Sequence, residues 1–330
     1  MVGPFCDGQH TDSCIDPFGG GMQWRESALW SGAQPHPHLL DPHLRRLRNA
    51  AERHEGCLGT LEHNLNVLAR SLTTRDEALV WESHSGRAQC MEQAEAATLF
   101  ASSAGVLAAA SRHAAARRFM AVSHGLLAAL SREAAPLSGG CSVPLTGQTN
   151  EPQRWFSSRG LGIETDGRTP WVLNQHLHAV YQLLQLSSIV RRPEIDSALA
   201  AADHRLARQL AIEGLRALVS HDELALERWF YHPTPAVDPR HVWVYYSLDD
   251  MTRAGRNISR AMTCHYGEHV LKKLDDIHAW LRANHDAEIA DLVEVLDRSA
   301  QRLREASANA EVRAAVGCRD SVPMGRTPRD

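Results

Sequence analysis

The sequence predicts an all-α fold, and within that class an (α/α) toroid of helix hairpins with short β-strands or loops at one end. Helical patterns follow one another from Asp41 to about residue 308. Several of these segments are rich in Ala and Leu, which suits close packing between helices. The helices also recur weakly in pairs without a tight internal repeat. Such pairs fit a toroid whose inner helices direct polar faces at a central cleft.

Three parts are expected along the chain. Residues 1–40 are rich in Gly, Pro, Asp and His without periodicity, and this composition predicts an extended N-terminal arm. Residues 41–308 are the expected toroid, which would be the catalytic domain. Residues 309–330 are polar and include Pro323 and Pro328, so we expect a flexible C-terminal tail.

The individual elements follow from local signals. The first helical stretch opens with Asp41 as a cap and Pro42 at the first helical position, and it should break near Gly56 or Gly59. A loop rich in Gly, Pro and Ser covers 135–170, and loops of this length are often functional. We expect further helices at 88–113, 114–134, 171–187, 193–221, 222–230, 256–282 and 286–308, and a short strand at 241–248.

Composition narrows the classes of function. The 330 residues include 35 Lys and Arg against 39 Asp and Glu, and the resulting net charge of -4 argues against binding to nucleic acid or an anionic membrane. No basic-then-apolar leader and no run of about 18 apolar residues is present, so we expect a cytoplasmic protein. The seven cysteines are dispersed and form no C-x-x-C pair, which predicts neither a disulfide framework nor a zinc ribbon.

The segment 170–187 places polar groups on one face of an apolar helix. Asn174, His178, Tyr181 and Gln185 share a face by the i, i+4, i+7 rule. His176 lies two residues before His178, so the two rings diverge by about 200° and cannot both face one cavity. We expect Asn174 and His178 to line a cleft, with Tyr181 as a substrate contact. The alternative is a solvated outer face.

The segment HYGEH carries a second candidate site. His265 and His269 are four residues apart on one helix face, a spacing that lets two imidazoles hold one metal ion. Glu268 completes the H-x-x-E-H pattern of inverted zinc proteases, in which the Glu is the general base. Gly267 costs about 1 kcal/mol against Ala within a helix. In a chain with 19 histidines the pattern can also arise by chance. Candidates for a third ligand are Cys264, Glu288, Glu294 and His178.

Other residues could hold a substrate. Arg256, in the charged stretch 249–260, could clamp a carboxylate through its planar guanidinium, as could Arg159. The alternative is a solvated charge run with a helix cap. Trp155 could supply a stacking surface for a sugar or peptide, although a tryptophan in the core is equally ordinary.

Five stretches together resemble the C-terminal toroid domain of the glucuronyl carbon-5 epimerases, over about 89–281. They are AQCMEQAEAATLF, GGCSVPL, RWFSSRGLG, WVLNQHLHAVYQLLQL and TCHYGEHVLKKL. Asn174 is on the matching position of the family's V-L-N helix, and His269 is retained in its last helix. The family's acidic and tyrosine-bearing segment is not retained, because Phe156, Ser157 and Arg159 occupy it here, and the family's β-rich N-terminal region is absent. The resemblance implies a toroid and epimerase-like chemistry.

Three functions are compatible with these observations. The first is an epimerase-like or isomerase-like enzyme that transfers protons next to a carboxylate or carbonyl, with His178, His265 and Tyr266 as acid and base. Its substrate would be a small molecule or short peptide, as in bacterial natural-product tailoring. The second is a hydrolytic or oxidative metal enzyme that uses His265, His269 and His178.

The metal hypothesis implies one divalent ion, zinc or copper, with Glu268 as the general base, whereas the first hypothesis implies no cofactor.

The third function is a non-catalytic binding module on a decayed epimerase scaffold. No nucleic-acid or membrane partner is expected, and a homodimer remains open.

Overall fold

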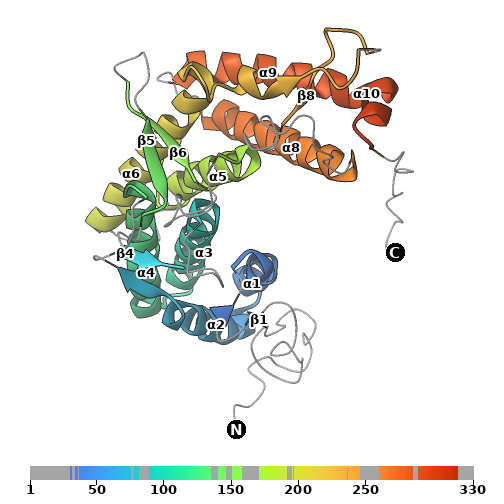
Figure 1. The fold of residues 1–330 in the computed structure, drawn as a ribbon. Helices are drawn as coiled ribbons and strands as arrows, with labels where there is room; N and C mark the ends of the chain where they lie inside the picture. The colour runs from blue at the N-terminus through green and yellow to red at the C-terminus, as the bar shows by residue number, and fades with distance from the viewer. Residues whose placement is uncertain are drawn as a thin grey trace, which may run out of the picture.

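A computed structural model describes residues 30–31, 34–35, 37–75, 78–81, 89–134, 140–145, 151–157, 171–191, 195, 197–235, 237–245, 260–284 and 289–318. Over these residues the protein is mostly helical, and its strands are only two to four residues long (Figure 1). This confirms the predicted all-α class.

The long helices of the described chain are arranged as successive hairpins in two layers. The first helices of neighbouring hairpins contact one another, and so do the second helices. Figure 1 shows that the array bends into a crescent with the first helices on its concave side. The hairpins are α1 (Pro37–Arg53) with α2 (Leu58–Arg70), α3 (Cys90–Ala109) with α4 (His113–Ser131), α5 (Leu173–Ile189) with α6 (Ser197–Ser220), and α8 (Arg260–Asn284) with α9 (Ala290–Ala308).

Short antiparallel strand pairs precede or connect these helices. One pair, β5 with β6, lies inside the stretch 135–170 that was expected to be a loop. The expected helix at 222–230 is a short 3-10 helix, Leu226–Trp229, followed by a strand. The pairs are β1 (Trp30–Ser31) with β2 (Gln34–Pro35), β3 (Thr73–Arg75) with β4 (Ala78–Val80), β5 (Ser142–Leu145) with β6 (Gln153–Phe156), and β7 (Phe230–Tyr231) with β8 (Trp243–Val244).

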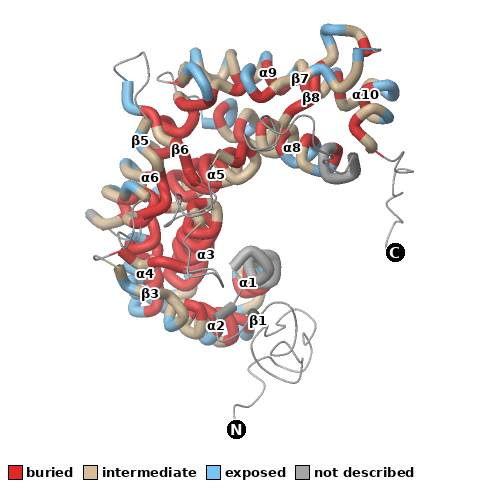
Figure 2. The backbone as a smooth tube through the Cα atoms, in the orientation of Figure 1, coloured by how far each residue is buried: buried red, intermediate tan, exposed pale blue. Residues whose placement is uncertain are grey.

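Helix α3 is the centre of the described core. Every residue from 92 to 108 is buried (Figure 2). Its small residues, mainly Ala, Ser and Gly105, let α1, α4 and α5 approach it closely. The carboxylates of Glu92 and Glu95 are therefore inside the protein, where an ionised group needs a polar partner.

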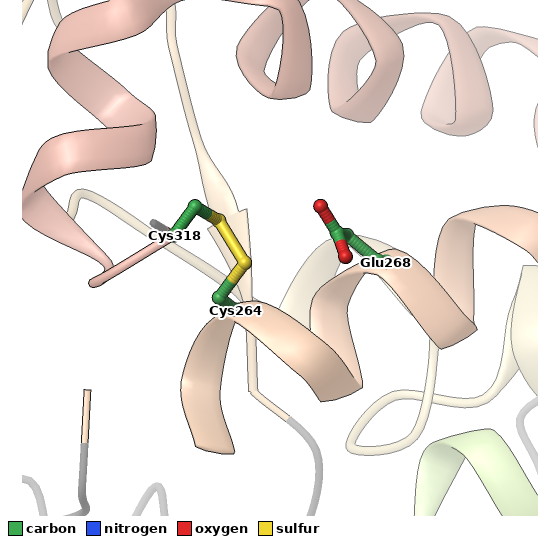
Figure 3. A group of neighbouring side chains, drawn as sticks. All are labelled: Cys264, Glu268 and Cys318. Atoms are coloured by element: carbon green, nitrogen blue, oxygen red, sulfur yellow. A yellow bond between two sulfur atoms is a disulfide. The ribbon is translucent and has the colours of Figure 1, made fainter. Parts of the chain in front are cut away.

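Disulfides correct the expectation drawn from the cysteines. Cys90 at the start of α3 is bonded to Cys141 before β5, with their Cα atoms 5.3 Å apart. Cys264 in α8 is bonded to Cys318 after α10, with a Cα separation of 5.1 Å (Figure 3). Cys57 is also disulfide-bonded. The Cys90–Cys141 and Cys264–Cys318 pairs are 51 and 54 residues apart in the sequence, so local spacing could not indicate them.

The two ends of the chain also differ from the prediction. The expected arm lies mostly outside the described residues, and α1 begins at Pro37, within its predicted range. The start of the expected tail folds as α10 (Ala310–Ala315), capped by Asn309, whose side chain accepts hydrogen bonds from two backbone N–H groups. The disulfide at Cys318 attaches this segment to α8. None of the described helices combines the length and the apolar character that a membrane span requires.

Candidate active site

The predicted polar face of α5 is recognisable in its burial pattern. Asn174, His178, Tyr181 and Gln185 are all partly exposed. The apolar positions between them, Leu173, Leu177, Val180 and Leu184, are buried. Because α5 contacts α3 on one side and α8 on the other, this face lies among the helices of the concave layer.

The central feature of the site is a pair formed by His178 and Glu95 of α3. The Nε2 atom of His178 lies 2.6 Å from a carboxylate oxygen of Glu95. The Glu95 side chain is 6% exposed and the His178 side chain 14%, so the pair is largely shielded while the imidazole keeps some access to solvent. An ionised carboxylate only accepts hydrogen bonds, so Nε2 donates to Glu95 and Nδ1 of the neutral ring holds the lone pair.

Helix α1 contributes a cation beside this pair. The guanidinium of Arg45 donates to the side-chain oxygen of Gln182 at 3.2 Å. The amide nitrogen of Gln182 lies 3.2 Å from Nε2 of His178, which is a contact and not a hydrogen bond, because Nε2 donates its proton to Glu95. Gln182 thus places the Arg45 guanidinium near the histidine of α5, four residues before it on the same helix.

Helix α8, on the other side of α5 from α3, contributes a second cation to the site. The ammonium of Lys273 lies 5.0 Å from the centre of the Tyr181 ring, a cation–π arrangement. Burial lowers the pKa of Lys273, while Asp276 acts in the opposite direction. Burial and the nearby charge of Asp276 raise the pKa of Tyr181, so its hydroxyl keeps its proton at neutral pH.

His269 belongs to the same group of side chains. Partial desolvation of its ring, and then the charge of His265, lower the pKa of His269, and Lys273 and His178 act in the same direction. The rings of His265 and His269 are 4.4 Å apart between centroids, in an edge-to-face arrangement. Tyr266 contacts His265 edge to face, with 5.6 Å between ring centroids. The predicted histidines therefore lie on one side of the molecule, and α1, α3, α5 and α8 all contribute to their surroundings.

The residues of the H-x-x-E-H motif lie in two different environments. Glu268 forms an ion pair with Arg313 of α10 at 3.1 Å and points toward the disulfide, as Figure 3 shows for its carboxylate. Gly267 faces β8, where a Cβ atom would come within 2.3 Å of the Trp243 indole. The glycine is thus required by close packing, and the Glu268 carboxylate is engaged away from the two imidazoles.

In the described part of the chain, the one group of three or more candidate ligands that lie within 4.8 Å of one another is Cys264, Glu268 and Cys318. Its two sulfurs form a disulfide, so neither is a thiolate ligand, and the expectation that Cys264 could serve as a third ligand is wrong. The donor atoms of His178, His265 and His269 do not form such a group in this structure.

Burial decides the roles that were predicted for Trp155 and His176. Trp155 is fully buried, and its indole stacks on His176 and on Trp229, with centroid distances of 3.9 and 5.6 Å. Trp155 therefore lies in the core instead of forming a surface for a substrate. His176 accepts a hydrogen bond from the Phe156 N–H and contacts the Gly214 carbonyl, pointing away from His178 as predicted. Arg159 and Arg256 lie outside the described residues.

Sequence reasoning missed Glu95, Arg45 and Lys273. One signal could have indicated Glu95: it is a charged residue in an Ala-rich segment that has no polar face, so it must be buried with a partner. Arg45 and Lys273 look like ordinary surface residues of amphipathic helices. Their role depends on which helices become neighbours.

A second carboxylate–histidine pair lies in the outer layer. Nδ1 of His124 in α4 is 2.6 Å from a carboxylate oxygen of Asp203 in α6. Burial raises the pKa of Asp203, and His124 opposes that shift. The His124 side chain is 46% exposed. Among the described residues, His124 is the charged group that acts on the pKa of Asp203, so this pair has less of the surroundings that a catalytic site requires.

Comparisons of the chain with models of protein families, with curated proteins and with solved structures found no match.

Proposed function

We propose that the protein is an epimerase-like or isomerase-like enzyme that moves a proton on a carbon next to a carboxylate or carbonyl, with His178 as the base. The observation that carries this proposal is the 2.6 Å contact between His178 and the buried Glu95, with the cations Arg45 and Lys273 close by. A carboxylate that holds one ring nitrogen orients the imidazole and stabilises its protonated form.

The proposed roles follow from these contacts. Nδ1 of His178 takes the proton, and Glu95 compensates the charge that then develops on the ring. Arg45 and Lys273 bind the carboxylate of the substrate and stabilise the enolate. Tyr181, which keeps its proton at neutral pH, is the proton donor. His265, His269 and Tyr266 border the substrate, and Asn174, on the same partly exposed face as His178, binds it.

The resemblance to glucuronyl epimerases and a closed (α/α) toroid remain part of this proposal. The two-layered, curved arrangement of hairpins supports a toroid. We propose a small molecule or short peptide as the substrate, as expected for a bacterial tailoring enzyme. The disulfides favour an oxidising compartment over the cytoplasm that the sequence suggested, because disulfides are rare where thiols are kept reduced.

Hydrogen exchange in heavy water tests the proposal. Purified protein is incubated in D2O with a panel of small carboxylic acids and short peptides, and deuterium at the carbon next to the carboxylate is measured by NMR and mass spectrometry. His178→Gln should lower exchange by a factor of about 100 to 10,000. His124→Gln is the matched control, because it removes a histidine from the outer carboxylate–histidine pair and should leave exchange unchanged.

Equal loss in both variants, or exchange that persists in His178→Gln, would contradict the assignment of the base. No exchange over the whole panel, with a folded protein that still binds one of the acids, would favour the binding-module hypothesis.

A metal-dependent hydrolytic or oxidative enzyme is the second candidate. The adjacent rings of His265 and His269 favour it, since two imidazoles on one helix face can share a zinc or copper ion. Elemental analysis of purified protein, compared with His269→Ala, tests it. One metal per chain that is lost in the variant supports this candidate, and an active protein without metal eliminates it.

A further inference from the structure

Lysine is nearly absent from this chain. Of its 35 Lys and Arg residues, only the adjacent Lys272 and Lys273 of α8 are lysines, and all the others are arginines. A guanidinium is always protonated in a protein, whereas an amine can lose its proton and act as a nucleophile. A lysine at position 273 therefore offers chemistry that arginine does not.

The two lysines have different surroundings. The Lys272 side chain is 68% exposed, and its ammonium donates to both carboxylate oxygens of Asp276, at 3.1 and 3.0 Å. The Lys273 side chain is 15% exposed, and its Nζ lies 3.7 Å from the same carboxylate, beyond hydrogen-bond distance. Lys273 is therefore the more desolvated of the two amines, and Asp276 holds it less tightly.

The Lys273 amine lies on the side of α8 that faces the proposed site. Helices α5 and α8 contact each other (Figure 1), and Nζ lies 5.0 Å from the centre of the Tyr181 ring on α5. The charge of Glu95 on α3 acts on the pKa of Lys273, in the direction that raises it. The amine is thus within electrostatic reach of the carboxylate that holds His178.

The surroundings of Lys273 favour its neutral form. Burial is the largest influence on its pKa and lowers it. The charges of Lys272 and Arg45 act in the same direction, and those of the two nearby carboxylates oppose them. Desolvation and a neighbouring cation are two ways in which proteins activate a lysine as a nucleophile.

We propose that Lys273 is a catalytic residue that binds an aldehyde or ketone substrate covalently as an imine. This inference rests on the proposed function, because it gives the substrate of that site its chemical class. Nζ bonds to the carbonyl carbon, and the carbonyl oxygen leaves as water with two protons from the ammonium. The product is an iminium ion, so the positive charge stays on the nitrogen. For such a substrate, this bond replaces the ion pair assigned to Lys273 above.

The iminium ion then stabilises the carbanion. His178 removes a proton from the carbon next to the C=N group, the C–H electrons form a C=C bond, and the C=N electrons move to the nitrogen. The resulting enamine is neutral. Protonation of its carbon by Tyr181 restores the iminium, and addition of water releases the carbonyl compound and the ammonium. Solvent returns His178 and Tyr181 to their starting protonation states, and Arg45 keeps its role as partner of a substrate carboxylate.

Reductive trapping of the full chain at neutral pH tests the proposal. The probes are pyruvate, a ketone with a carboxylate, and dihydroxyacetone, a ketone without one, and the reductant is sodium cyanoborohydride. Hydride adds to the iminium carbon and leaves a stable secondary amine, which tandem mass spectrometry assigns to a residue. The adduct should form mainly on Lys273, although Lys272 is the more exposed lysine.

Arginine variants separate covalent from electrostatic catalysis. Lys273→Arg keeps the positive charge but cannot form the imine. It should lose the adduct and lower the exchange of the pyruvate methyl protons in D2O by about 100-fold or more. Lys272→Arg is the matched control, because it makes the same change at the adjacent exposed position and should keep both the adduct and the exchange. If Lys273→Arg is unfolded by circular dichroism, the position of the adduct in the wild type decides.

Equal adducts on the two lysines, or no adduct with either probe, would overturn the proposal. So would exchange that continues in Lys273→Arg, and the proposed function would then stand with Lys273 as a non-covalent cation. An adduct on Lys273 together with exchange that persists in His178→Gln has the opposite meaning. It would contradict the assignment of the base and would support the imine.

Discussion

The imidazole of His176 stacks on the indole of Trp155, with ring centroids 3.9 Å apart and planes 9° from parallel. Both side chains are fully buried. Two residues further along α5, His178 contacts Glu95 on the concave side. One helix therefore carries a structural histidine and a candidate catalytic histidine in different surroundings.

Acid should destabilise the protein through His176. Burial lowers the pKa of His176 to about 3, whereas the unfolded chain binds the proton near pH 6.5. The stabilisation is complete above pH 6.5 and is lost as the pH falls toward about 3, with a maximum of about 5 kcal/mol. Urea unfolding at several pH values should show this slope, and His176→Gln should reduce it by about 1.4 kcal/mol per pH unit. An unchanged slope in the variant would contradict the assignment.

Gly267→Ala should destabilise the protein, although alanine usually stabilises a helix by about 1 kcal/mol. The added Cβ would lie 2.3 Å from the Trp243 ring. We expect a loss of about 1–3 kcal/mol in the free energy of unfolding, the usual cost of overpacking. Gly56→Ala is the control, because a Cβ there has no atom within 4 Å. Stabilisation of Gly267→Ala would show that Trp243 does not pack as described.

Reduction should destabilise the C-terminal part of the array. The Cys264–Cys318 bond closes a loop with a sequence separation of 54, which the chain-entropy model values at about 4 kcal/mol. Urea unfolding with and without dithiothreitol measures the total effect of all disulfides, and Cys264→Ser with Cys318→Ser isolates this one. Five of the seven cysteines, Cys57 among them, are described as disulfide-bonded, so a thiol titration of the denatured, unreduced protein should find fewer than three free thiols. Three or more thiols would contradict the described pairing.

The sequence was sufficient to predict what depends on local periodicity. The spacing of Asn174, His178 and Tyr181 indicated the polar face of α5, and the offset of two residues separated His176 from it. The all-α class followed in the same way. The match between these local predictions and the structure reflects the strong coupling of side-chain direction to position along a helix.

Features that join distant segments could not be predicted. Helix α3 is buried on all sides, so its sequence can indicate that Glu95 is a buried charge but cannot indicate that its partner is His178 of α5. The two described cysteine pairs join segments more than 50 residues apart. Glu268 has the spacing of a catalytic base, but the fold brings Arg313 of α10 beside it, and that helix follows a segment expected to be unstructured.

A double-mutant cycle on the exchange reaction tests most directly whether Glu95 and His178 act as a unit. Exchange rates in D2O are measured for the wild type, Glu95→Gln, His178→Gln and the double variant. If Glu95 works through His178, the double variant should be no slower than His178→Gln alone. If the two losses multiply instead, the residues act independently, and the proposed proton-transfer site is contradicted.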